Sequence, residues 1–173
     1  LSGKDGGAKF LADLRKFGMM WLVDDWTLVH PSLGPEPLED GFNHAAFHTV
    51  LKRRGAPIKS VLLDQEVVAG IGNIYADEAL FAAGINPKKP ANSLSRPAVD
   101  RLHAAIREVL HTALGDRGSS FRDYVDGAGR EGGHQLKVKV FRRTGEPCYA
   151  CGTDIRRIKL GGRSTHYCPK CQK

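Results

Sequence analysis

The chain has 173 residues, 41% of them hydrophobic, which suits one ordinary globular domain or two small ones. It shows no run of about eighteen apolar residues and no signal peptide, so a membrane-spanning protein is not expected. The formal charge of +7 is uneven: residues 1–129 carry 15 Lys or Arg against 16 Asp or Glu, and residues 130–173 carry 11 against 3. This local excess predicts a polyanion-binding surface, although a merely soluble basic surface has the same composition.

The first part of the chain predicts incomplete β-structure followed by a linker. Residues 17–30 read as two short strands around the turn Asp24-Asp25. A two-stranded hairpin is marginal alone, and the chain begins with Leu1 rather than Met. We therefore expect the partner strands to lie upstream, in a longer protein. Residues 31–42, which are rich in proline, predict a linker.

Four helices with short connections are predicted next, from apolar periodicity and from capping residues. They are expected from Asn43 to about Arg54, from Pro57 to Leu63, from Ile74 to Ala83 and from Ser95 to Gly115. The longest has Pro97 in its first turn and a stripe of apolar residues with a period of 3.6. A polar, glycine-rich loop follows, and residues 136–141 then alternate as a strand would.

Four cysteines near the C-terminus form two matched pairs, Cys148-Tyr-Ala-Cys151 and Cys168-Pro-Lys-Cys171. Two such pairs, separated by sixteen residues, have the spacing of a tetrahedral, structural Zn²⁺ site. Between them, Gly161-Gly162 predicts the turn of a β-hairpin. Two disulfides or one redox pair are the alternatives. Because all four cysteines belong to one motif, we expect a reducing, cytoplasmic setting.

The stretch Gly70-Ile-Gly-Asn73 predicts a turn that leads into a helix. Free backbone N–H groups at a helix start attract anions, and the Asn73 side chain adds a donor. Phosphate binding and an ordinary helix cap are both compatible with these residues.

These segments resemble a known family. Residues 58–65 and 68–81 resemble the helix–two-turn–helix segment of bacterial formamidopyrimidine-DNA glycosylase, and residues 144–148 and 168–173 resemble its zinc finger. The resemblance runs from about Asp13 to the last residue, and it is weaker for the sister family, endonuclease VIII.

The resemblance implies a mainly α fold with a small β zinc element. It divides the chain into a remnant of an N-terminal β-sandwich, the linker, a helix–two-turn–helix DNA-binding domain with a lesion-capping loop, and a zinc-finger β-hairpin. These parts are expected at residues 1–30, 31–42, 43–134 and 135–173.

The implied activity is DNA base-excision repair: excision of oxidised purines such as 8-oxoguanine and formamidopyrimidines, then cleavage of the abasic site by β,δ-elimination. The implied partner is lesion-containing duplex DNA, bound by a monomer in the bacterial cytoplasm at the nucleoid. The family nucleophile, an N-terminal proline, has no counterpart in Leu1-Ser2, so we expect no catalysis by this chain alone. Alternatives are a stand-alone DNA-binding module and a protein-binding zinc ribbon.

The resemblance also suggests DNA-binding residues. Asn73, Lys59 and Arg163 match family residues that contact DNA, and we expect Tyr75 to be a core residue or a sugar contact rather than a catalyst. For Lys59, a solvated helix lysine is the alternative. For Arg163, the alternative is an ordinary exposed turn residue.

Two further segments match loops that act on the everted base. Arg15 and Phe17 match a pair that inserts into the gap in the DNA, unless Phe17 simply begins a strand. Ser119, Ser120 and Tyr124 lie in the loop expected to close over the base. The chain departs from the family at Leu14, His134 and Arg142, the last of which replaces a frequent glycine.

Overall fold

The computed structural model describes residues 22–25, 33–116 and 133–173. The predictions for Leu14, Arg15 and Phe17, those for residues 119, 120 and 124, and most of the hairpin expected at 17–30 lie outside the described residues. The chain divides into two units, Leu1–Pro31 and Ser32–Lys173. Every helix and strand given below belongs to the second unit.

The fold is mainly α with a small β element, as predicted. Its helices are α1 (His44–Lys52), α2 (Ile58–Leu62), α3 (Asn73–Ala82) and α4 (Arg96–Gly115), with short 3₁₀ helices η2 (Ala91–Ser93) and η3 (His134–Leu136). All four predicted helices are confirmed, with ends shifted by one or two residues. None of the helices in the described part of the chain has the length and hydrophobicity of a membrane-spanning segment.

Capping explains where the helices begin. Asn43 caps α1, because its Oδ1 accepts a hydrogen bond from Ala46 N at 2.9 Å. Ser95 occupies the N-cap position of α4 without a side-chain cap, and Pro97 in the first turn fixes the backbone instead. Gly84 follows α3 with φ 69°, the left-handed conformation that ends many helices.

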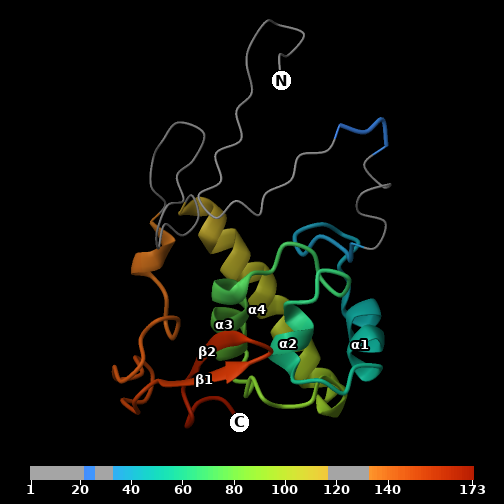
Figure 1. Cartoon of the computed structure of the whole chain (residues 1–173). Coiled ribbons are helices and arrows are strands. Elements are labelled where there is room, and N and C mark those ends of the chain that lie inside the picture. The colour runs from blue at the N-terminus through green and yellow to red at the C-terminus, as the bar shows by residue number, and fades with distance from the viewer. Residues whose placement is uncertain (1–21, 26–32, 117–132) are drawn as a thin grey trace, which may run out of the picture. The chain divides into compact units, whose positions relative to one another are not determined.

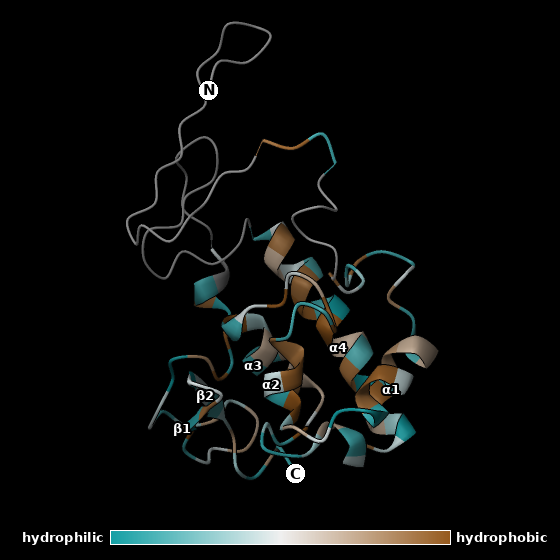
Figure 2. Cartoon of the chain, turned by 45° about the vertical axis from the view of Figure 1, so that its right-hand side comes forward, coloured by the Kyte–Doolittle hydropathy of each residue, from teal (hydrophilic) through white to brown (hydrophobic). Residues whose placement is uncertain are grey.

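The helical part, residues 33–116, buries one apolar core. Helix α4 packs against α1 and α3, and α2 contacts α3 (Figure 1). The apolar faces of these helices turn toward one another (Figure 2). The largest fully buried apolar side chains of this core include those of Leu51, Leu62, Leu80, Leu102 and Ile106.

The cysteine element, residues 137–173, contains one antiparallel hairpin of β1 (Arg156–Leu160) and β2 (Arg163–Tyr167) (Figure 1). Leu160 pairs with Arg163, so the loop has two residues, Gly161 and Gly162, with φ 52° and 77°. Both values lie in the left-handed region, which a two-residue hairpin turn of this kind requires. The predicted hairpin is confirmed.

The strand expected over residues 136–141 is wrong. The described chain forms η3 and then an irregular arm, residues 137–141. The backbone N–H groups of Lys139, Val140 and Phe141 donate to the carboxylate of Glu78 on α3, at 2.7–3.0 Å. A side chain therefore satisfies the donors that a neighbouring strand would otherwise satisfy.

Candidate nucleic-acid interface and metal centre

The four cysteine sulfurs gather at one point of the cysteine element. All four lie within 4.8 Å of one another, and the pairs Cys148–Cys171 and Cys151–Cys168 are 3.9 and 3.5 Å apart. Tetrahedral zinc with Zn–S bonds of about 2.3 Å places its sulfurs about 3.8 Å apart. The cysteines are free and their separations far exceed a disulfide bond of about 2.05 Å, so the disulfide alternative is wrong.

The ionisation of the thiols also suits a dication. Hydrogen bonds from Thr153 lower the pKa of Cys151 to about 6, which favours its thiolate form. Hydrogen bonding to Cys151, together with burial and the other sulfurs, raises the pKa of Cys171 to about 12. Burial likewise raises the pKa of Cys168. Four crowded thiolates need a positive ion among them, and the cysteine element carries one structural Zn²⁺ site.

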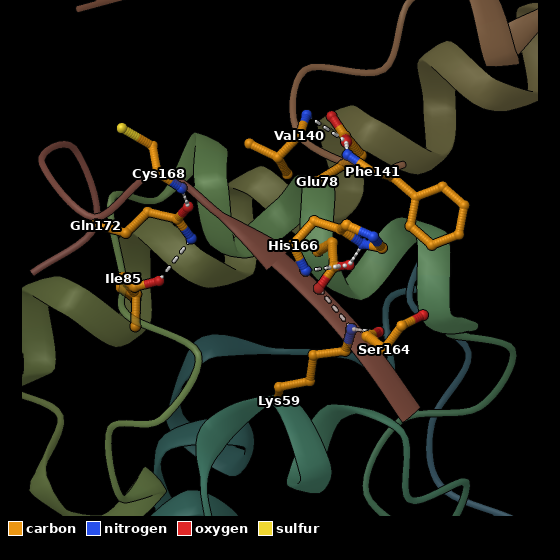
Figure 3. Close-up of polar contacts among 10 residues, drawn as sticks. Lys59, Glu78, Ile85, Val140, Phe141, Ser164, His166, Cys168 and Gln172 are labelled. Atoms are coloured by element: carbon orange, nitrogen blue, oxygen red, sulfur yellow. Dashed lines mark hydrogen bonds and ion pairs between the residues drawn. The ribbon is translucent and has the colours of Figure 1, made fainter. Parts of the chain in front are cut away.

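The surrounding residues fix the two cysteine pairs in place. Cys148 N donates to Thr153 O at 2.9 Å, and Gly152 N donates to Cys148 O at 2.8 Å. In the second pair, Gln172 Oε1 accepts from Cys168 N, and its Nε2 donates to Ile85 O beyond the end of α3 (Figure 3). The metal site is therefore attached to the helical part through a buried glutamine.

Two adjoining hollows lie where the hairpin meets the start of α3. One, of about 610 Å³, is lined by residues that include Asn73, Arg157, Lys159 and Arg163. The other, of about 430 Å³, is lined by Asn73 and Arg163 again and by residues of α2 and the hairpin turn. We call the residues Asn73, Arg157, Lys159 and Arg163 the basic hollow. It combines a helix N-terminus, a carboxamide and three exposed cations, a combination suited to phosphate groups.

Asn73 is the first residue of α3, and Gly72 occupies the N-cap position. The helix start therefore lies one residue earlier than predicted, and no side chain caps it. The Oδ1 of Asn73 is buried without a hydrogen-bond partner among the described residues. A buried polar atom without a partner marks a place that water or a ligand completes.

Arg157 and Lys159 were not predicted from the sequence as individual residues. They lie on β1, and only the overall charge excess pointed to them. From Arg157 to Leu160, cationic and apolar residues alternate directly before the turn Gly161-Gly162. This period of two, typical of a strand with one exposed face, would have singled them out.

Lys59 is buried between α2 and the hairpin rather than exposed on the surface. Its side chain is fully buried, and its Nζ is 2.5 Å from Asp77 Oδ1 and 3.1 Å from Ser164 O. The alternative of a solvated helix lysine is wrong. Direct contact with DNA stays a prediction, because it would require the ammonium to leave Asp77.

Two further positions that the sequence singled out, Tyr75 and Arg142, are less buried than Lys59. Tyr75 on α3 is partly buried, which is compatible with packing or with a sugar contact. Arg142 has φ 61°, the left-handed region where glycine is favoured. A glycine, which the family resemblance suggests at this position, would adopt this conformation without strain.

The helix–turn arrangement and the four-cysteine hairpin define a class: zinc-finger DNA-binding proteins with a helix–two-turn–helix domain. The pattern of the formamidopyrimidine-DNA glycosylase H2TH domain matches residues 33–124, and that of the zinc finger found in FPG and IleRS matches residues 145–173.

Named relatives agree with these two matches. A formamidopyrimidine-DNA glycosylase of Desulfitobacterium hafniense is 51% identical over 170 residues, covering 96% of this chain and 62% of the relative. One from Listeria innocua is 47% identical over 165 residues, covering 93% of this chain and 60% of the relative.

Solved structures give the same result. The MutM (Fpg) protein of Thermus thermophilus aligns with TM-score 0.82 and 44% identity, over 86% of this chain and 57% of that one. A complex of Lactococcus lactis Fpg with abasic-site DNA aligns with TM-score 0.85 and 41% identity, over 94% of this chain and 61% of that one. The chain belongs to the formamidopyrimidine-DNA glycosylase family. It spans about 62% of the length of the curated relatives it matches.

Proposed function

We infer that this chain is the damaged-DNA-binding portion of a base-excision-repair enzyme. The whole protein would excise oxidised purines, such as 8-oxoguanine and formamidopyrimidines, and would cleave the resulting abasic site. It would act as a monomer on duplex DNA, at the nucleoid in the bacterial cytoplasm. The relatives' names and the L. lactis complex with abasic-site DNA support this proposal.

One observation carries the proposal: Asn73 at the start of α3 and Arg163 at the start of β2 line the same two hollows. These residues are 90 positions apart in the sequence, on the helical part and on the cysteine element. Zinc keeps the hairpin folded, and the hairpin supplies Arg163. Two separate elements can then contact one stretch of DNA backbone, Asn73 through its amide and Arg163 through a planar guanidinium.

Residues outside the basic hollow would contact the damaged base and the sugar. Arg15 and Phe17 would insert into the gap left by the everted base, and Ser119, Ser120 and Tyr124 would close over it. Tyr75 would contact sugar. Chemistry on the sugar needs the N-terminal proline amine of the family. We therefore expect neither strand cleavage nor a borohydride-trapped adduct from this chain alone.

The test is the salt dependence of binding to a duplex that carries an abasic-site analogue. Removing one cationic phosphate contact lowers the slope of log K against log salt by about one, and Arg163→Ala should also weaken binding about tenfold. Arg53→Ala is the matched control, because it removes the same charge from an exposed position at the end of α1. Equal effects of the two variants, or salt-independent binding by the unaltered chain, would contradict the proposal.

A further inference from the structure

Helix α3 presents two neighbouring carboxylates that are both buried, Asp77 and Glu78. Successive residues of an α-helix point about 100° apart, so the two acids face different segments. Glu78 accepts the three backbone N–H groups of the arm. Asp77 faces β2, at the other end of the cysteine element. One helix thus contacts the cysteine element on both sides of the metal ligands Cys148 and Cys151.

The carboxylate of Asp77 joins two elements. Its Oδ2 accepts a hydrogen bond from His166 N at 3.0 Å and lies 3.1 Å from His166 Nδ1. Its Oδ1 accepts from Lys59 Nζ. The same Nζ donates to the carbonyl of Ser164 at 3.1 Å, so Lys59 bonds β2 directly as well as through Asp77. Figure 3 shows Lys59 rising from α2 toward Ser164 and His166 on β2.

Both residues that this network contacts on β2 lie close to Arg163. Ser164 follows Arg163 directly, and its carbonyl is the acceptor of the Lys59 ammonium. The turn is also packed on α2, since a Cβ added at Gly161 would lie 3.2 Å from Ser60 Oγ. The backbone of β2 next to Arg163 is therefore fixed to α2, while the Arg163 side chain itself is exposed.

A buried ion pair of this kind is poorly explained by stability alone. Removing two charges from water costs about as much as their attraction returns, and an apolar pair of similar volume often does as well. Burial lowers the pKa of Lys59, although Asp77 opposes this shift. What the pair adds is directional bonding: the ammonium donates to oxygens, and the carboxylate accepts from N–H groups, only at particular places.

We propose that Lys59 is a positioning residue for Arg163: with Asp77 it fixes the start of β2, so that the guanidinium lies beside Asn73 in the basic hollow. Lys59 then acts on DNA binding without touching DNA. The proposal rests on the proposed function, because it assigns Lys59 a role in the same phosphate contact.

A double-mutant cycle tests the proposal with Lys59→Met, Arg163→Ala and the double variant of the zinc-loaded chain. If Lys59 acts through Arg163, Lys59→Met weakens duplex binding about tenfold in the unaltered background and less than about twofold when Arg163 is already alanine. If Lys59 contacts a phosphate itself, it weakens binding by the same factor in both backgrounds. That additive result would overturn the proposal.

Thr165→Val is the matched control. Thr165 is fully buried on the same strand, and its Oγ1 has no hydrogen-bond partner among the described residues. Removing this hydroxyl breaks no contact that the structure describes, so we expect unchanged DNA binding. An effect as large as that of Lys59→Met would overturn the proposal, because any change inside β2 would then suffice.

A second variant and a second measurement separate positioning from folding. Asp77→Asn keeps an oxygen acceptor for His166 N and removes the charge that faces Lys59. It should retain zinc and give the same non-additive cycle. Without DNA, the amide chemical shifts of residues 163–166 should move in both variants, whereas those of α1 should not. Loss of zinc from both variants would overturn the proposal, because Lys59 would then maintain the fold rather than position Arg163. Failure of the unaltered chain to bind duplex DNA would instead overturn the proposed function.

Discussion

The helical part and the cysteine element are stabilised by different interactions, apolar burial in the first and metal binding in the second. The helical part buries more than twenty residues in one apolar cluster, mainly alanine, leucine, isoleucine and valine. The buried cluster of the cysteine element contains Val140, Ile155 and two of the metal ligands, Cys148 and Cys168. A segment this small rarely gains enough from apolar burial alone, so a metal supplies the missing stabilisation. One side of the basic hollow therefore depends on the hydrophobic core of the helical part, and the other side depends on zinc binding.

Zinc removal should give the largest effect. Structural Zn²⁺ binding contributes on the order of 10–16 kcal/mol to small zinc-finger peptides. Chelation, or Cys168→Ala, should therefore unfold the hairpin while α1–α4 stay helical, and should weaken duplex binding more than a hundredfold. Zinc content, circular dichroism and DNA affinity measure this outcome. Simultaneous loss of the helices would mean that the two regions fold as one, and unchanged affinity would remove the cysteine element from the DNA contact.

A core truncation in the helical part should reverse that outcome. Leu102 on α4 is fully buried in the apolar cluster, and Leu102→Ala should cost about 2–5 kcal/mol. We expect a lower thermal midpoint for the helical signal and unchanged zinc affinity at a temperature where the helices remain folded. Leu114→Ala is the control, because this leucine on the same helix is exposed. A weakened zinc site in Leu102→Ala would show that the metal centre depends on the apolar core.

Acid should weaken the helical part through His103. Burial lowers the pKa of His103, and the charges of His44 and Arg107 lower it further. The hydrogen bond to the Phe42 carbonyl and the charge of Asp100 oppose this shift. The unfolded chain then binds the proton at a higher pH than the folded chain. This stability is present above about pH 6.5 and is lost as the pH falls through the lower folded pKa.

His103→Gln should flatten this pH dependence, in zinc-loaded and in chelated samples alike, because the residue belongs to the helical part. Thermal midpoints of the helical signal between pH 7 and pH 5 provide the measurement. A variant as acid-sensitive as the unaltered chain would show that other groups control the effect.

Arg142→Gly should give the smallest effect. A non-glycine residue in the left-handed region costs roughly 1–2 kcal/mol of folding free energy. Replacing it by glycine removes this cost, but glycine loses more backbone entropy on folding, so the net gain is smaller. The variant should therefore bind zinc slightly more tightly, by less than about 1 kcal/mol. Arg156→Gly, in the extended strand β1, is the control and should weaken the element instead. Weaker zinc binding by Arg142→Gly would show that the arginine side chain contributes more than its backbone costs.

The sequence predicted what is local. Helix caps such as Asn43, the turn at Gly161-Gly162, and the cysteine spacing each depend on residues a few positions apart. These features predicted all four helices, the hairpin and the zinc site.

Contacts between distant residues could not be read in the same way. Glu78 bonds the arm across 61–63 positions, and its role replaced the strand expected there. Lys59 donates to the carbonyl of Ser164, which lies 105 positions away. From the sequence, Lys59 was expected to be an exposed DNA contact, but it is buried. Asp77 and Glu78 looked like ordinary helix acids, because only the fold shows that they face inward.

Chemical-shift mapping of the ¹⁵N-labelled, zinc-loaded chain on titration with duplex DNA shows directly whether the helical part and the cysteine element contact the same DNA. We expect the DNA titration to perturb the amides around Asn73 on α3 and also those of Arg157, Lys159 and Arg163 on the hairpin. The amides of His44 and Asp100, which join α1 to α4, should stay unchanged. Perturbations confined to α3, or confined to the hairpin, would contradict a DNA contact shared between the helical part and the cysteine element.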